Sequence, residues 1–147
     1  MRKLKGQIIL IDDEQYEEDF LKNCLSELEY DVEVKYFGTA TEALDYLKTS
    51  KEDTFLVISD LHMPGMGGLE LKERIDNDPD IKLKSIPFVF ATTAPTKEGI
   101  LQAYKHNIQG FFKKPVDLNE LKSFISIIIR YWTINLHPNK SDYAHYL

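Results

Sequence analysis

The sequence predicts an α/β fold in which a five-stranded parallel sheet carries helices on both faces. Short apolar segments alternate with segments of helical period from one end of the chain to the other. Three of the apolar segments, residues 8–11, 55–58 and 87–91, show no alternation with polar residues, which is typical of strands buried on both faces. Hydrophobic residues make up 43% and charged residues 29% of the 147 residues, which is ordinary globular composition and excludes a disordered chain.

The elements follow one another in βα order. Strands are expected at residues 7–11, 32–37, 55–59, 86–91 and 110–113. Helices are expected at residues 14–28, 68–77 and 96–107, and after each of the capping residues Thr39 and Asp117. Both of these residues precede a Glu by three positions, which is the spacing of a capping box, and the last helix should end near Trp132. The polar stretch 77–85, which contains Asp78-Pro79, is expected to be a loop.

We expect one domain at residues 7–133, between an N-terminal tail of residues 1–6 and a C-terminal tail of residues 134–147 that is too short for an output domain. The net charge of −6 argues against a nucleic-acid partner, because phosphate binding needs clustered basic residues. Cys24, the single cysteine, cannot form an internal disulfide. The apolar runs are too short for a signal peptide or a membrane span, so we expect a cytoplasmic protein with no membrane partner.

Polar residues follow four of the expected strands. Asp12 and Asp13 follow the first, Asp60 the third, Thr92 the fourth and Lys114 the fifth. Taken singly, each is an ordinary capping, turn or surface residue, but the carboxyl ends of parallel strands share one edge of the sheet. Two carboxylates about 4 Å apart repel each other by roughly 4 kcal/mol, so three of them call for a cation. Oxygen ligands favour a hard divalent ion, and Mg²⁺ fits best.

Four segments in this order resemble the receiver domain of two-component response regulators. They are ILIDDE at residues 9–14, VISDLHMPGMGG at 57–68, PFVFATTA at 87–94 and GFFKKP at 110–115. The resemblance covers about residues 7–133, and its strength lies in the four motifs occurring together on successive strand ends. It implies a doubly wound, flavodoxin-like three-layer sandwich with strand order 2-1-3-4-5.

The resemblance also implies a chemistry for the acidic residues. Asp60 would be the phosphoacceptor, which takes a phosphoryl group from a phosphohistidine on a sensor histidine kinase. Asp12 and Asp13 would hold Mg²⁺ together with Asp60, and the backbone carbonyl of His62 is the further ligand that the family uses. The protein would be a signalling protein whose own chemistry is limited to Mg²⁺-dependent self-phosphorylation and autodephosphorylation.

Three more residues receive roles from the resemblance. Lys114 would pair with a phosphoryl oxygen, and the bond from Lys114 to Pro115 resembles the family's cis peptide. Thr92 would donate its hydroxyl to another phosphoryl oxygen and, by moving, open space for Phe111 as a switch. Without the family, Phe111 is more simply interpreted as a core aromatic residue.

The apolar residues of the last helix extend around more of its circumference than one packed face needs. We hypothesise that this surplus forms, with residues of the fourth helix and fifth strand, a surface for a downstream target, a phosphorelay partner or a second copy of the chain. That surface consists of Ile100, Tyr104, Phe111, Ile127 and Ile129. The equally weighted alternative is that the C-terminal tail, with Tyr143, Tyr146 and Leu147, folds back and covers it.

Two other functions compete with a phosphorylatable receiver. A receiver-like interaction module that is never phosphorylated is disfavoured because the five residues of the site are complete, namely Asp12, Asp13, Asp60, Thr92 and Lys114. A flavin or dinucleotide module on a similar sheet is disfavoured because the first βα turn is Asp-Asp-Glu, whereas phosphate cradles use Gly or hydroxyl residues.

Overall fold

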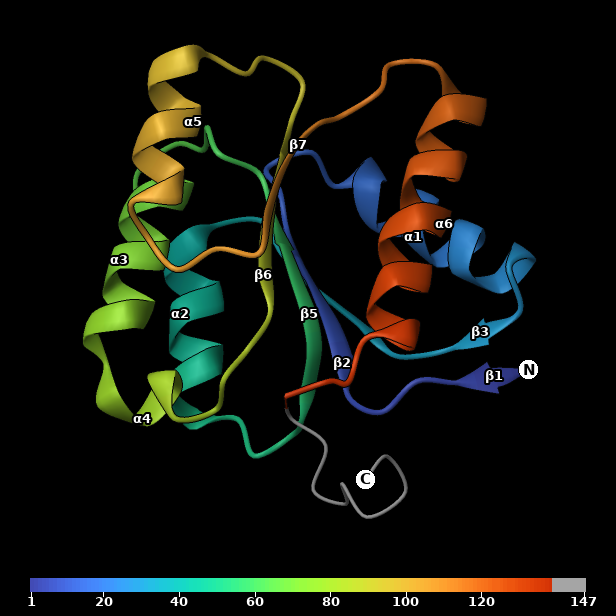
Figure 1. Cartoon of the computed structure of the whole chain (residues 1–147), viewed down its shortest axis with the longest axis horizontal. Coiled ribbons are helices and arrows are strands. Elements are labelled where there is room, and N and C mark those ends of the chain that lie inside the picture. The colour runs from blue at the N-terminus through green and yellow to red at the C-terminus, as the bar shows by residue number, and fades with distance from the viewer. Residues whose placement is uncertain (139–147) are drawn as a thin grey trace.

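The computed structural model describes residues 1–138 and contains a parallel five-stranded sheet (Figure 1). Its strands are β2 (Gln7–Ile11), β4 (Val34–Phe37), β5 (Thr54–Ser59), β6 (Phe88–Thr92) and β7 (Gly110–Lys113). They lie in the order β4-β2-β5-β6-β7, which is 2-1-3-4-5 when these five strands are counted along the chain. The predicted sheet and its strand order are therefore confirmed.

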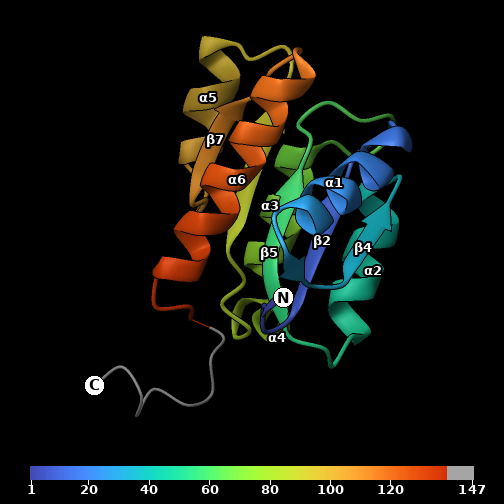
Figure 2. The same cartoon turned by 90° about the vertical axis from the view of Figure 1, so that its right-hand side faces the viewer.

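Helices cover both faces of this sheet, so that the domain has three layers. Helices α1 (Tyr16–Glu27) and α6 (Leu118–Ile134) lie on one face, which Figure 2 views from the front. The opposite face carries α2 (Ala40–Thr49), α3 (Gly68–Asn77), the short α4 (Pro79–Lys82) and α5 (Lys97–Tyr104). No helix among the described residues has the length and apolar character needed to span a bilayer.

The core consists of two apolar clusters, one on each face of the sheet. Strand β5 supplies side chains to both, since Leu56 and Ile58 belong to the cluster under α1 and α6 and Val57 belongs to the other. All six residues of β5 are buried, which explains why this segment shows no polar alternation. Packing on both faces holds the strands in place, and with them the edge of the sheet at which they end.

Side-chain capping sets where two of the helices begin. Thr39 Oγ1 accepts a hydrogen bond from the Glu42 amide at 3.3 Å, and Asp117 Oδ1 accepts from the Asn119 and Glu120 amides at 2.9 and 3.0 Å. Both predicted helix starts are confirmed.

Two segments differ from the sequence prediction. Residues 79–82, expected as part of a loop, form the one-turn helix α4, because Asp78 caps it and Pro79 occupies its first position. In the expected N-terminal tail, β1 (Arg2–Lys3) pairs in parallel with β3 (Tyr30–Asp31).

Candidate functional site

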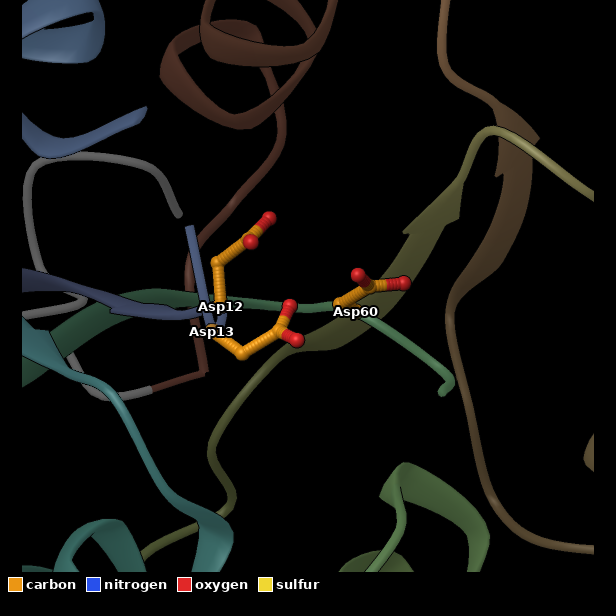
Figure 3. A group of neighbouring side chains, drawn as sticks. All are labelled: Asp12, Asp13 and Asp60. Atoms are coloured by element: carbon orange, nitrogen blue, oxygen red, sulfur yellow. The ribbon is translucent and has the colours of Figure 1, made fainter. Parts of the chain in front are cut away.

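Three carboxylates meet where β2 and β5 end, as Figure 3 shows. Asp12 and Asp60 directly follow these two neighbouring strands, and the Asp60 amide continues the ladder by donating to the carbonyl of Ile11 at 2.8 Å. Asp12, Asp13 and Asp60 each offer an oxygen within 4.8 Å of the others. In Figure 3 the Asp13 side chain extends toward Asp60, and a divalent cation with oxygen ligands suits this donor set.

The three carboxylates differ in burial and in their partners. Asp12 is 2% exposed and accepts a hydrogen bond from the Glu14 amide at 2.9 Å, whereas Asp13 is exposed. Asp60 is partly buried and accepts from the Leu61 amide at 2.7 Å. Burial raises the pKa of Asp60, and the Asp12 charge adds to this rise, while the Leu61 amide opposes it. Ionised Asp60 is thus costly without a cation nearby.

Lys114 supplies the positive charge at this edge. Its amide donates to the carbonyl of Thr92 at 2.7 Å, which ties the end of β7 to the end of β6. Its Nζ donates to Asp12 Oδ2 at 2.9 Å and to Glu17 Oε1 at 3.2 Å. Burial opposes the charge of Lys114, but the bonds and charges of Asp12 and Glu17 outweigh it, so that its pKa is raised. Lys114 therefore stays protonated as an ammonium.

Glu17 is a site residue that sequence reasoning missed. It lies in the first turn of α1, and burial raises the pKa of its carboxyl although Lys114 draws that pKa down. In the sequence it is one of a run of acids at a helix start, where acids are common for reasons of the helix dipole. The one available signal was its spacing in the sequence, because Glu17 lies about one helical turn after Asp13.

Thr92 ends β6 and is 2% exposed, and its Oγ1 accepts a hydrogen bond from the Ala94 amide at 3.3 Å. Phe111 is partly buried on β7, with its ring centroid 6.0 Å from that of Phe90. This position agrees with the simpler interpretation of Phe111 as a core aromatic residue. His62, two residues after Asp60, has an exposed side chain.

Two expectations about the site and its surroundings are wrong. No peptide bond among residues 1–138 is cis, so the bond between Lys114 and Pro115 is trans, and the Lys114 side chain reaches Asp12 from that backbone. Ile129 is fully buried and cannot belong to an exposed surface. It lies four residues after Ile125 and three before Trp132, which puts it on the packed stripe of α6.

The other members of the expected partner surface are accessible. Tyr104 is 57% exposed and Ile127 is 69% exposed, while Ile100 stands at 36% and Phe111 is partly buried. The alternative cover by Tyr143, Tyr146 and Leu147 lies outside the described residues.

Comparisons with known proteins agree with this geometry. The family model for the response regulator receiver domain matches residues 8–126. The chemotaxis protein CheY1 of Helicobacter pylori (strain ATCC 700392 / 26695) is 29% identical over 125 residues, which cover 84% of this chain and 96% of CheY1.

Two solved structures share the fold. One is the phosphorylated cyanobacterial phytochrome response regulator RcpA, with a TM-score of 0.81 and 24% identity over 92% of this chain and 99% of RcpA. The other is the Mn²⁺-bound form of the response regulator Rcp1, with a TM-score of 0.76 and 22% identity over 86% of this chain and 94% of Rcp1.

Proposed function

The chain belongs to the family of response regulator receiver domains, and on that premise we propose that Asp60 accepts a phosphoryl group from a phosphohistidine on a sensor histidine kinase. A receiver is a signalling protein. In our proposal, the aspartyl phosphate changes how this chain binds another protein. The observation that carries the proposal is the convergence of Asp12, Asp13 and Asp60 at the sheet edge where Lys114 also lies.

The proposed transfer is a displacement at phosphorus. A carboxylate oxygen of Asp60 attacks, a P–O bond forms, and the P–N bond to the donor histidine breaks. The electron pair of that bond stays on the ring nitrogen, which takes up one proton from water and leaves as neutral imidazole. The protein contributes mainly position and charge, since Asp60 is held by the Leu61 amide at the end of a buried strand.

We propose Mg²⁺ as the divalent cation of the site. Asp12, Asp13 and Asp60 are hard oxygen ligands close enough to share one ion, and the carbonyl of His62 is the proposed further ligand. When bound, the ion supplies positive charge that offsets the repulsion among the carboxylates and the phosphoryl oxygens. The response regulator Rcp1, which shares this fold, has been solved in an Mn²⁺-bound form, and this supports the proposal that the chain binds a divalent cation.

Lys114 and Thr92 are proposed to hold the transferred group. The ammonium of Lys114 would pair with one phosphoryl oxygen. The hydroxyl of Thr92 accepts a bond from Ala94, so its own proton can be donated to another phosphoryl oxygen. In this proposal, movement of Thr92 toward the phosphate lets Phe111 turn further inward.

The signal is proposed to leave through the face formed by α5, β7 and α6. Its accessible apolar residues are Ile100, Tyr104 and Ile127, with Phe111 at its border. A downstream protein, a phosphorelay partner or a second copy of the chain would dock there. The net charge of −6 makes nucleic acid an unsuitable partner.

Beryllofluoride, a stable mimic of the phosphoryl group, separates this function from that of a receiver-like module that is never phosphorylated. Calorimetric titration in Mg²⁺ should show one site in the wild type and none in Asp60→Asn. Asp19→Asn, which removes the same charge at an exposed position of α1, is the matched control and should bind as the wild type does. Absence of binding in the wild type would favour the interaction module.

A further inference from the structure

We infer that Glu17 is a positioning residue that holds the ammonium of Lys114 in the resting state and competes for it with the phosphoryl group on Asp60. This inference rests on the proposed function, since it concerns what phosphorylation of the same site must displace. It adds a fourth carboxylate to the three at the strand ends.

The geometry of Lys114 is that of a shared cation. Its Nζ lies 2.9 Å from Asp12 Oδ2 and 3.2 Å from Glu17 Oε1, and the Lys114 and Glu17 side chains are only 10% and 12% exposed. Among the ion pairs of residues 1–138, those of Lys114 are with Asp12 and Glu17, and none joins it to Asp60. In the resting site, the ammonium is thus committed to two carboxylates other than the acceptor.

The surroundings of Glu17 are mainly apolar and provide few polar groups that could replace Lys114 as its partner. A cavity of about 30 Å³, room for about one water molecule, is lined by Asp12, Glu17, Asp60 and Lys114 together with apolar side chains. The apolar side chains include Leu21, Ile58, Leu121 and Phe124. A Glu17 carboxylate that lost its ion pair would face this mainly apolar wall, where an unpaired charge is costly.

Pairing of Lys114 with a phosphoryl oxygen is therefore opposed by the ion pairs that Lys114 already makes. Each N–H of the ammonium that turns to the phosphoryl group must leave Glu17 or Asp12, or be the third donor that neither uses. This competition for Lys114 weakens binding of the phosphoryl group, so a higher concentration of phosphoryl donor or mimic is needed to occupy the site.

The simpler alternative is that the ion pair of Glu17 and Lys114 only anchors α1 to the end of β7. That role predicts a loss of stability when Glu17 is replaced, but no gain in affinity for a phosphoryl mimic. Affinity for beryllofluoride at saturating Mg²⁺ therefore separates the two roles. Glu17→Gln keeps the size of the side chain, and Glu17→Met is a second variant suited to the apolar wall if the first does not fold.

The experiment is a beryllofluoride titration of the wild type, Glu17→Gln and the control Asp19→Asn, repeated in a Lys114→Met background. We expect Glu17→Gln to bind about tenfold more tightly than the wild type, Asp19→Asn to stay within about twofold, and the gain to vanish without Lys114. A gain that persists in the Lys114→Met background would mean a general charge effect and would overturn the inference.

The two proposals fail in different ways. Binding by the wild type with no change in Glu17→Gln overturns the role of Glu17 and leaves the proposed function intact. No binding by either protein overturns the proposed function, and the role of Glu17 falls with it.

Discussion

Lys114 Nζ and Asp12 Oδ2 lie 2.9 Å apart although the two residues are separated by 102 positions in the chain. Asp12 follows β2 and Lys114 follows β7, and strands β5 and β6 lie between these two in the sheet. The Lys114 side chain thus extends across the sheet edge at which Asp60 also lies. Both residues are buried, so the contact belongs to the stability of the fold as well as to its proposed chemistry.

Loss of the Lys114 ammonium should destabilise the metal-free protein. Lys114→Met leaves Asp12 and Glu17 buried without their cation, and breaking a buried pair on one side costs about 3 kcal/mol or more. Urea unfolding without divalent ions measures this loss. The matched control is Lys113→Met, whose side chain is exposed and whose change should stay within about 0.5 kcal/mol. Equal stabilities of the two variants would contradict the account.

Loss of the Asp60 charge should stabilise the metal-free protein. Asp60→Asn relieves repulsion among the three carboxylates, and each kcal/mol gained raises the melting temperature by about 3 °C in a domain of this size. The same variant should be stabilised less than the wild type by added Mg²⁺, because one ligand is gone. Thermal melting with and without Mg²⁺ tests both points, and an undiminished Mg²⁺ response would count against the metal site.

Glu17 predicts a pH dependence of stability in the metal-free protein. Burial raises the pKa of Glu17 above its ordinary value of 4.5, so its protonated form is favoured by folding. The stability that comes from this proton is present below the unfolded pKa and is lost as the pH rises through the folded pKa. Wild-type stability should therefore fall relative to Glu17→Gln as the pH is raised from 4.5. Urea unfolding of both proteins from pH 4.5 upward measures the difference between their free energies of unfolding. A difference that does not change with pH would refute the prediction.

Two neighbouring isoleucines of α6 should respond in opposite ways to truncation. Ile129 is fully buried, so Ile129→Ala should cost about 2–5 kcal/mol. Ile127 is 69% exposed, so Ile127→Ala should change stability by no more than about 0.5 kcal/mol. Urea unfolding of both variants is the measurement. If Ile127→Ala were the costlier, the assignment of the exposed face of α6 would be wrong.

The strands and the acidic edge could be predicted because their signals are local. Asp12 and Asp60 each end a short apolar run, and parallel strands end at a common edge, so their meeting follows from the sheet alone. The helix starts at Thr39 and Asp117 were predictable for a similar reason, since a cap and its partner lie within one turn.

Features that depend on how elements pack were not predictable. Glu17 meets Lys114 from 97 positions away, and this contact depends on how α1 lies over the sheet. The burial of Ile129 is an exception, because its spacing from Ile125 and Trp132 already places it on the packed stripe of α6. Strand β1 has two residues and no periodicity, and its place is set by pairing with Tyr30–Asp31.

Intact-mass spectrometry after incubation with acetyl phosphate and Mg²⁺ tests the assignment of Asp60 as phosphoacceptor most directly. The donor loses its phosphoryl group as its P–O bond breaks, acetate leaves, and the wild type should gain the mass of one phosphoryl group. The adduct should be absent from Asp60→Asn and present in the control Asp19→Asn. An adduct that persists in Asp60→Asn would contradict the assignment, as would its absence from a wild-type protein that also fails to bind beryllofluoride.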